Sequence, residues 1–312
     1  YWWYVMNVKS VVQTRTHYDK LAQALEHQRA GQLAEAKGIY LGLLEANPDD
    51  ANASHLLGML MHQTGNGSQA IGLIKKALLL MPDTPLFLNN LGQVYLQCNQ
   101  IKLAESTLLK ATQTDPDAAA PLYGLAECSR RRGQFQQAAD FTRLVLERDP
   151  GHIDAIVCLG RIHLDTQSLE KAIELFDVAL SAKPDHLDAK LFKANAKIVL
   201  RQYDEAIADL NQLVELPIVS PAVFFNLGNA YMGLKEFEHA KSAYRKVISL
   251  VPHDIAARFN LGLALIESNQ LKIAVECMEG GLVIDPENGR LQELLRHTKS
   301  RLSVDVDLVS VE

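Results

Sequence analysis

Residues 221–254, PAVFFNLGNAYMGLKEFEHAKSAYRKVISLVPHD, hold a pattern that recurs before and after them at one fixed spacing. The first half of this stretch carries apolar or small residues at the i, i+3, i+4 and i+7 spacing of one helical face: Phe224, Leu227, Gly228 and Tyr231. The second half carries a shorter set of the same kind: Ala240, Tyr244 and Val247. The stretch therefore predicts two short amphipathic helices that pack on each other.

An interval of 34 residues runs through most of the chain. Alanine recurs at this interval eight times in succession: Ala36, Ala70, Ala104, Ala138, Ala172, Ala206, Ala240 and Ala274. A second column contains only glycine or alanine: Ala24, Gly58, Gly92, Ala126, Gly160, Ala194, Gly228 and Gly262. Small residues in both columns allow the two helices of a repeat to approach closely, because larger side chains there would overpack the contact.

The pattern resembles the tetratricopeptide repeat. That family has a large apolar residue, Leu, Gly and Tyr in its first helix, then Ala, Tyr and a terminating Pro, and these positions are filled by Phe224, Leu227, Gly228, Tyr231, Ala240, Tyr244 and Pro252. The resemblance implies an all-α fold, a right-handed α-solenoid superhelix of helix-turn-helix repeats. We predict eight repeats over 17–288, namely 17–50, 51–84, 85–118, 119–152, 153–186, 187–220, 221–254 and 255–288.

The ends of the chain differ from the repeats. Residues 1–16 are an N-terminal extension, in which Met6 is a candidate natural start unless the segment belongs to a longer upstream protein. Residues 289–302 have the apolar stripe of a C-terminal cap helix. Residues 303–312, SVDVDLVSVE, alternate like a strand, and we interpret them as a disordered tail or as a severed linker to a missing domain.

Local signals predict where the helices begin and end. Left-handed backbone is expected in the turns at Gly31, Gly65, Asn99, Gly133 and Asn269. Asp115-Pro116, Asp149-Pro150 and Asp285-Pro286 should end second helices, since proline cannot continue a helix. Repeat 6 ends in the irregular string PIVSP, residues 217–221. Within it, Ser220 should cap a helix that starts at Pro221.

Composition excludes several function classes. The net charge of −6 disfavours nucleic acid as a partner, and no apolar run is long enough for a membrane span. The four cysteines form no CxxC pair, and His55 and His62 stand seven residues apart. We therefore expect no metal site and no cofactor, and we expect the histidines to lie on the surface. No phosphate-binding glycine loop, GxSxG elbow or HExxH helix is present, which predicts a non-enzymatic, cytoplasmic protein of undetermined oligomeric state.

The family resemblance implies that first helices line a concave groove. Carried over by register, the main candidates for binding an extended peptide are Asn195, Phe225, Asn226, Asn229, Phe259 and Asn260. Amides can pair with a peptide main chain, and phenylalanines can supply apolar anchors, although packing roles are an open alternative. Secondary groove candidates are Asn89, Asn90, Gln93, Tyr123, Arg130, Arg131 and Arg161. The arginines could bind an anion, but Glu127 and Asp165 lie near in register and predict an internally neutralised patch.

The sequence predicts a scaffold that binds a protein or peptide segment in this groove. The family's dicarboxylate clamp for chaperone C-termini is rejected, because Ala256 and Asn260 stand where Lys and Arg are required. The alternative is a substrate-recruiting arm of a multidomain enzyme. Strings such as LNNLGQVYLQ loosely resemble arrays that precede bacterial glycosyl-, sulfo- or methyltransferase domains.

Overall fold

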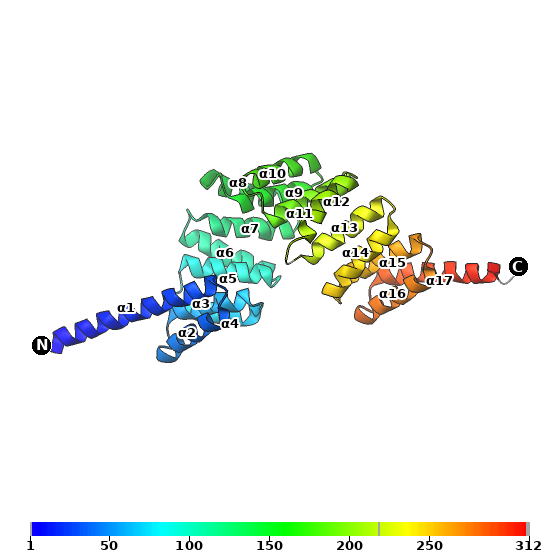
Figure 1. The fold of residues 1–312 in the computed structure, drawn as a ribbon. Coiled ribbons are helices and arrows are strands. Elements are labelled where there is room, and N and C mark those ends of the chain that lie inside the picture. Colours follow the sequence, from blue (N-terminus) through cyan, green and yellow to red (C-terminus); the bar gives the residue numbers. More distant parts are fainter. Residues whose placement is uncertain (1, 218, 310–312) are drawn as a thin grey trace. The chain divides into compact units, whose positions relative to one another are not determined.

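The computed structural model describes residues 2–217 and 219–309, and within that part of the chain it contains seventeen α-helices and no strand. The predicted all-α fold is confirmed, and Figure 1 shows the helices following one another as pairs joined by short turns. Their bounds are α1 Trp2–Arg29, α2 Leu33–Ala46, α3 Ala51–Gln63, α4 Gly67–Leu80, α5 Pro85–Gln97, α6 Ile101–Thr114, α7 Ala119–Arg131, α8 Phe135–Arg148, α9 Ile153–Asp165, α10 Leu169–Ala182, α11 Leu187–Val199, α12 Tyr203–Val214, α13 Pro221–Gly233, α14 Phe237–Leu250, α15 Ile255–Glu267, α16 Leu271–Ile284 and α17 Gly289–Val309.

Helix lengths follow the repeat with one exception. First helices from α3 to α15 have 13 residues, and second helices have 14 residues, but α12 has only 12. The short helix precedes the irregular string that the sequence placed at the exit of repeat 6. Ser220 caps α13 with its hydroxyl accepting from the Ala222 amide, and Pro221 is the first helical residue, as predicted.

Both ends are helical where the structure describes them. The α1 helix starts at Trp2, so residues 2–16 continue the first helix of repeat 1. The α17 helix continues to Val309, and the strand-like interpretation of 303–309 is wrong. Extending an existing helix adds one hydrogen bond for each residue fixed, whereas a lone strand has no partner. Residues 310–312 lie outside the described part, and the division into extension, repeats, cap and tail stays a prediction.

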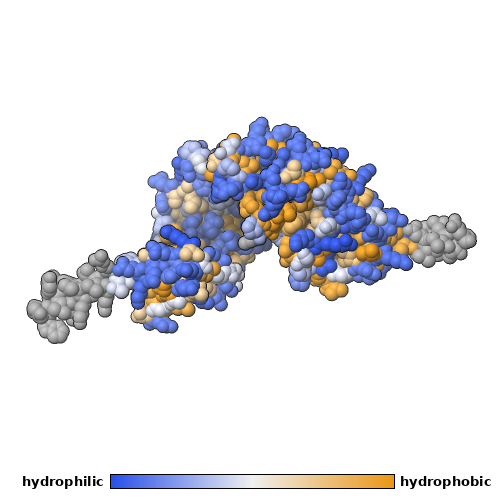
Figure 2. Space-filling model, viewed as in Figure 1, coloured by the Kyte–Doolittle hydropathy of each residue, from blue (hydrophilic) through white to orange (hydrophobic). Residues whose placement is uncertain are grey.

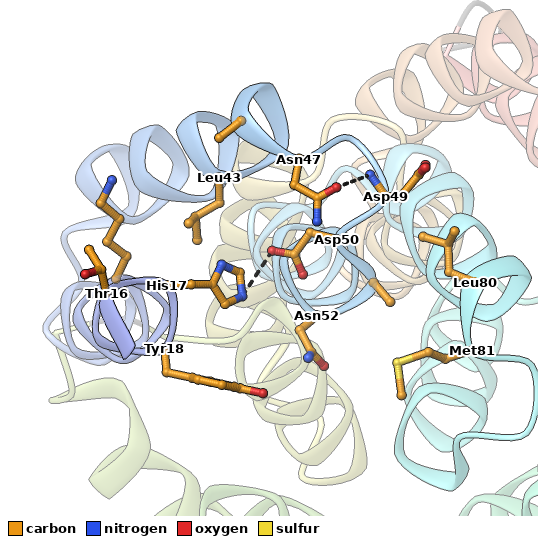
Figure 3. A pocket seen from close by; sticks show the side chains of 13 residues that line it. Thr16, His17, Tyr18, Leu43, Asn47, Asp49, Asp50, Asn52, Leu80 and Met81 are labelled. Carbon is orange, nitrogen blue, oxygen red and sulfur yellow. Dashed lines mark hydrogen bonds and ion pairs between the residues drawn. The ribbon is translucent and has the colours of Figure 1, made fainter. Parts of the chain in front are cut away.

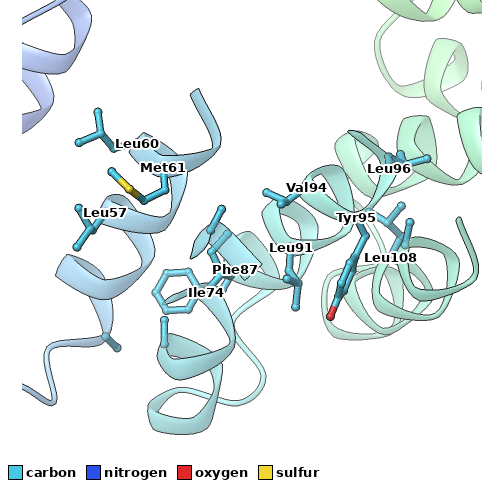
Figure 4. Packing of buried hydrophobic residues seen from close by; sticks show 14 of the residues in the cluster. Leu57, Leu60, Met61, Ile74, Phe87, Leu91, Val94, Tyr95, Leu96 and Leu108 are labelled. Atoms are coloured by element: carbon cyan, nitrogen blue, oxygen red, sulfur yellow. The ribbon is translucent and has the colours of Figure 1, made fainter. Parts of the chain in front are cut away.

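The chain divides into two compact units, residues 1–158 and 159–312. The first unit is built on one continuous apolar cluster, part of which is shown in Figure 4, where Ile74 and Phe87 from adjacent repeats lie side by side. In the second unit, one apolar cluster surrounds Leu210 and Leu227, and another surrounds Leu265 and Met278. Polar and charged residues cover much of the face seen in Figure 2, with apolar residues between them.

The small-residue columns explain the packing inside each repeat. All eight alanines of the 34-residue column are fully buried. The glycine column makes room for a large side chain sixteen residues later: a Cβ on Gly228 would lie 2.5 Å from Tyr244, and one on Gly92 would lie 2.5 Å from Leu108. Glycine is needed at these two positions because a side chain, rather than a second backbone, fills the space above it.

Eight turns, spaced 34 residues apart, have left-handed backbone. The five predicted positions are confirmed, with φ between 57° and 79° at Gly31, Gly65, Asn99, Gly133 and Asn269. The remaining three turns use residues that the sequence did not single out: Gln167, Arg201 and Lys235, with φ of 61°, 62° and 61°. These L-residues adopt a conformation that favours glycine, so their turns carry backbone strain.

Candidate protein-binding surface

The six main candidates lie on three successive first helices of the second unit. Asn195 belongs to α11, Phe225, Asn226 and Asn229 belong to α13, and Phe259 and Asn260 belong to α15. All six side chains are half-buried, so each keeps a surface that another molecule can reach. We call these six residues the first-helix surface.

Asn229 is the centre of a hydrogen-bond network on this surface. The Tyr244 hydroxyl donates to Oδ1 of Asn229 at 2.8 Å, and Nδ2 of Asn260 donates to the same oxygen at 3.1 Å. Tyr244 is 1% exposed, and burial raises the pKa of its phenol, which therefore stays a neutral donor. The network fixes the position of Asn260 and leaves its own Oδ1 as an acceptor.

Asn195 and Asn226 are not used in this way. Among the hydrogen bonds of the described residues, none involves either side-chain amide. The two phenylalanines are partly engaged in packing: the Phe225 ring meets Tyr244 edge-on at 5.8 Å, and the Arg290 guanidinium lies 4.8 Å above the Phe259 ring. Asn226 thus combines a free amide with apolar neighbours.

The first unit holds a related cluster with a buried histidine. His55 is 3% exposed, stacks on Phe87 with ring centres 4.3 Å apart, and lies 2.9 Å from Nδ2 of Asn90 through its Nε2. The expectation of a surface histidine is wrong here, because Phe87 covers the ring. Burial lowers the pKa of His55 to about 4, so the neutral ring accepts through Nε2 at neutral pH. Asn89 completes the cluster by donating to Asn90 at 3.3 Å.

The arginine candidates of α7 are held by a buried carboxylate. Glu127 is 7% exposed and accepts two bonds from Arg130, at 3.1 and 3.0 Å, and one from Arg131 at 2.7 Å. Arg131 also donates to the Leu96 carbonyl at 2.8 Å. Their guanidiniums are therefore fixed by the protein itself, which favours the predicted neutralised patch over an anion site.

The remaining secondary candidates are Arg161, Tyr123 and Gln93. Arg161 stacks its guanidinium 4.6 Å above Phe192, and the Tyr123 ring lies 5.6 Å from that of His152. Gln93 fills the space above Gly124, where a Cβ would lie 2.8 Å from its Nε2.

A cavity of about 890 Å³ lies at the start of the repeats, between α1, α2 and the α4 end (Figure 3). Asp50 projects toward it, with Oδ2 3.3 Å from Nε2 of His17 and Oδ1 accepting from the Ala53 amide at 3.0 Å. The second contact is the N-cap of α3, so this carboxylate holds the helix start. Leu80 and Met81 line the other side of the cavity.

Metal ligands do not gather in the described part of the chain, and burial keeps two of the four cysteine thiols protonated. No group of three or more His, Cys, Asp or Glu side chains there could hold a metal ion. Burial raises the pKa of Cys128 to about 12 and also raises that of Cys277, so both remain protonated at neutral pH. None of the described helices is both long and apolar enough to cross a lipid bilayer.

Family models described as tetratricopeptide repeat match residues 27–89 and 163–216, residues 89–153, and residues 221–254. Among curated relatives, BBSome complex member BBS4 of Bos taurus is 22% identical over 278 residues, covering 89% of this chain and 53% of the relative. Anaphase-promoting complex subunit 3 of Schizosaccharomyces pombe is 23% identical over 193 residues, covering 62% and 29%. The chain thus spans about half the length of the first and under a third of the second.

Solved structures agree in fold. The crystal structure of the APC/C hetero-tetramer Cut9-Hcn1 contains a chain with a TM-score of 0.72 at 20% identity, covering 89% of this chain and 55% of that one. Yeast Tom70 gives a TM-score of 0.63 at 16% identity, covering 89% and 61%. These similarities show the α-solenoid fold. The resemblance to arrays that precede transferase domains stays a prediction.

Proposed function

Because the chain belongs to the tetratricopeptide repeat family, we propose that it is a protein-interaction scaffold whose first-helix surface binds an extended segment of a partner protein. Stacked repeats expose a long, continuous surface, which suits a partner that lies along it. Two of the relatives are named as members of multiprotein complexes, the BBSome and the anaphase-promoting complex. Their names support assembly with other proteins as the role of this chain.

The observation that carries the proposal is that Asn226 has a free amide, while Asn260 has one that is held by Asn229. The two residues occupy the same position of adjacent repeats, within the repeated string FNLG. Asn226 keeps an acceptor and two donors for a peptide backbone, and Asn260 keeps its acceptor. Phe225 and Phe259, one residue earlier in each helix, supply apolar surface for alternate side chains of the segment.

Binding by neutral amides predicts broad sequence preference and weak dependence on salt. The test begins with affinity capture using the full chain, followed by mass spectrometry of the retained proteins. The affinity of a recovered partner is then measured for the double variant Asn226→Ala and Asn260→Ala. Loss of neutral hydrogen bonds worth about 0.5–1.5 kcal/mol each should weaken binding roughly tenfold.

The matched control changes Arg130 and Arg131 to Ala, and, once folded, it should bind the partner as the unchanged chain does. Because this change leaves the buried Glu127 carboxylate without these partners, circular dichroism melting sets a temperature at which the control is folded. The single variant Asn226→Ala adds a second check, since this side chain makes no internal hydrogen bond and its loss should leave the urea midpoint unchanged. If the arginine variant abolishes binding while the asparagine variant binds normally, the first-helix surface is not the binding site.

A further inference from the structure

A cavity of about 520 Å³ lies between the second helices of repeats 6 and 7, on α12 and α14, with α13 as its base. It opens beside the shortest of the second helices, α12, which ends at Val214. The base is apolar and consists of Phe224, Leu227 and Tyr231. None of the six residues of the first-helix surface lines this cavity, so it is a separate site.

The rim of this cavity is basic. Arg245 and Lys246 are exposed, and neither forms an ion pair among the described residues. The Lys246 Nζ lies 5.9 Å from the centre of the Phe224 ring, which places its charge over the apolar base. His239 stacks on Tyr231 with ring centres 5.0 Å apart. No carboxylate is among the described residues that line the cavity.

The preceding repeat has an equivalent space, but there the charged residues lie at its base. Thirty-four residues earlier, Lys190, Lys193 and Lys197 stand in the positions of Phe224, Leu227 and Tyr231. The space there is only about 110 Å³. Two of these three lysines are neutralised internally: Lys193 lies 2.5 Å from Asp177, and Lys197 lies 2.7 Å from Asp209 and 3.2 Å from Glu205.

Each of those three acids is missing from the larger cavity. The residues that replace Asp177, Glu205 and Asp209 are Asn211, His239 and Ala243. Arg245 and Lys246 stand where the preceding repeat has Asn211 and Gln212, so the larger cavity gains two cations at its rim while its described lining residues include no carboxylate. Glu236, which is not among the lining residues, lies 3.1 Å from His239. The complementary groups must come from another molecule if the charges of Arg245 and Lys246 are to be paired.

We propose that this cavity, the second-helix pocket, binds a short acidic segment of a partner protein that carries one aromatic or branched aliphatic side chain. The apolar side chain enters the space over Phe224 and Tyr231. Flanking Asp or Glu carboxylates pair with Arg245, whose planar guanidinium can make two parallel hydrogen bonds, and with Lys246. The pocket recognises charge and one anchor, whereas the first-helix surface offers amides.

The test uses the full chain and a fluorescein-labelled peptide, Glu-Asp-Trp-Asp-Glu, blocked at both ends, with Gln-Asn-Trp-Asn-Gln as its neutral counterpart. The acidic peptide should bind, more weakly as ionic strength rises, and the neutral one should bind at least roughly tenfold less tightly. The variant with Arg245→Glu and Lys246→Glu should lose binding by a similar factor. Phe224→Lys, which introduces the residue of position 190, should also lose it.

The matched control is Lys75→Glu with Lys76→Glu, an equal change of charge at the same register of repeat 2, and it should bind the acidic peptide normally. Circular dichroism melting checks that each variant folds. If Phe224→Lys does not fold, the variant with Arg245→Glu and Lys246→Glu decides the outcome, because both of its positions are exposed. Equal binding of both peptides, or an equal loss in the repeat 2 control, would overturn the proposal. So would tighter binding of a single-stranded oligonucleotide of the same charge.

Discussion

Asn90 in the first unit and Asn260 in the second occupy the same position of the repeat, yet their side chains form hydrogen bonds with different chemical groups. Nδ2 of Asn90 lies 2.9 Å from the imidazole of His55, and Nδ2 of Asn260 lies 3.1 Å from the amide oxygen of Asn229. The imidazole of His55 can take up a proton in acid, and the amide oxygen of Asn229 cannot. The repeat register places a side chain, but its neighbour decides whether the site responds to pH.

The turns of the two units differ as well. The first four left-handed turns use Gly31, Gly65, Asn99 and Gly133, which tolerate positive φ. Three of the four turns in the second unit use Gln167, Arg201 and Lys235. Identical backbone geometry is therefore reached with little strain in one unit and with strain in the other.

The largest expected effect is a loss of stability of the first unit in acid. His55 has a pKa of about 4 when folded and 6.5 when exposed, so the unfolded state binds more protons between these values. The free energy of unfolding should fall as pH drops from 6.5 to 4, by on the order of 3 kcal/mol, and should be insensitive to this group above pH 6.5. Burial also lowers the pKa of His62, which adds an effect of the same sign.

Hydrogen-exchange protection factors, measured separately for α3, α5, α13 and α15, check this prediction. Protection in α3 and α5 should decrease across the window more than protection in α13 and α15. The variant His55→Gln keeps a polar group beside Asn90 and should remove most of the difference. Equal pH dependence in both pairs of helices, or an unchanged difference in the variant, would contradict the claim that His55 makes the first unit sensitive to acid.

Both units contain the alanine column, and a Leu substitution in it should lower the unfolding free energy of either unit to a similar extent. Ala70 and Ala206 are fully buried between the helices of their repeats. Replacing either with Leu should overpack the contact and cost about 1–3 kcal/mol of unfolding free energy, measured by urea denaturation. Lys76→Ala, at an exposed site, should change it by less than about 0.5 kcal/mol. A cost confined to one unit would show that the other tolerates larger residues in the column.

The periodic sequence predicted the helices, the buried columns and five left-handed turns, because each depends on a residue's position within its own repeat. It did not predict the strained turns, because Arg201 and Lys235 are not residue types that favour positive φ, although they stand at the same repeat position as the predicted glycines and asparagines. Likewise His55 is buried by Phe87, a residue of the following repeat. Contacts between repeats depend on which side chains meet, and a spacing rule does not specify that.

Tyr244→Phe tests whether the hydrogen-bond network of the second unit is independent of pH. The change removes the hydroxyl that donates to Asn229, while the amide of Asn260 still donates to the same oxygen. Because no buried acceptor loses its last partner, the cost should be about 0.5–1.5 kcal/mol, constant from pH 4 to 8. Urea denaturation at several pH values measures it. A cost that grew in acid would show that the second unit also contains a titrating partner.

The smallest effect is expected from exchanging turn residues between the units. Arg201 has φ of 62° and is exposed, so Arg201→Gly should relieve backbone strain with little loss of contact. Glycine makes the unfolded chain more flexible, which offsets part of that gain, and we expect a net stabilisation of about 0.5–1 kcal/mol. The reciprocal change, Gly133→Arg, meets no atom within 4 Å of its Cβ, so backbone strain alone should destabilise the first unit by a similar amount. Opposite shifts of the urea midpoint would establish that the turns of the second unit store strain. If neither midpoint moved, the positive φ at Arg201 would cost nothing, and the difference between the turns would have no energetic meaning.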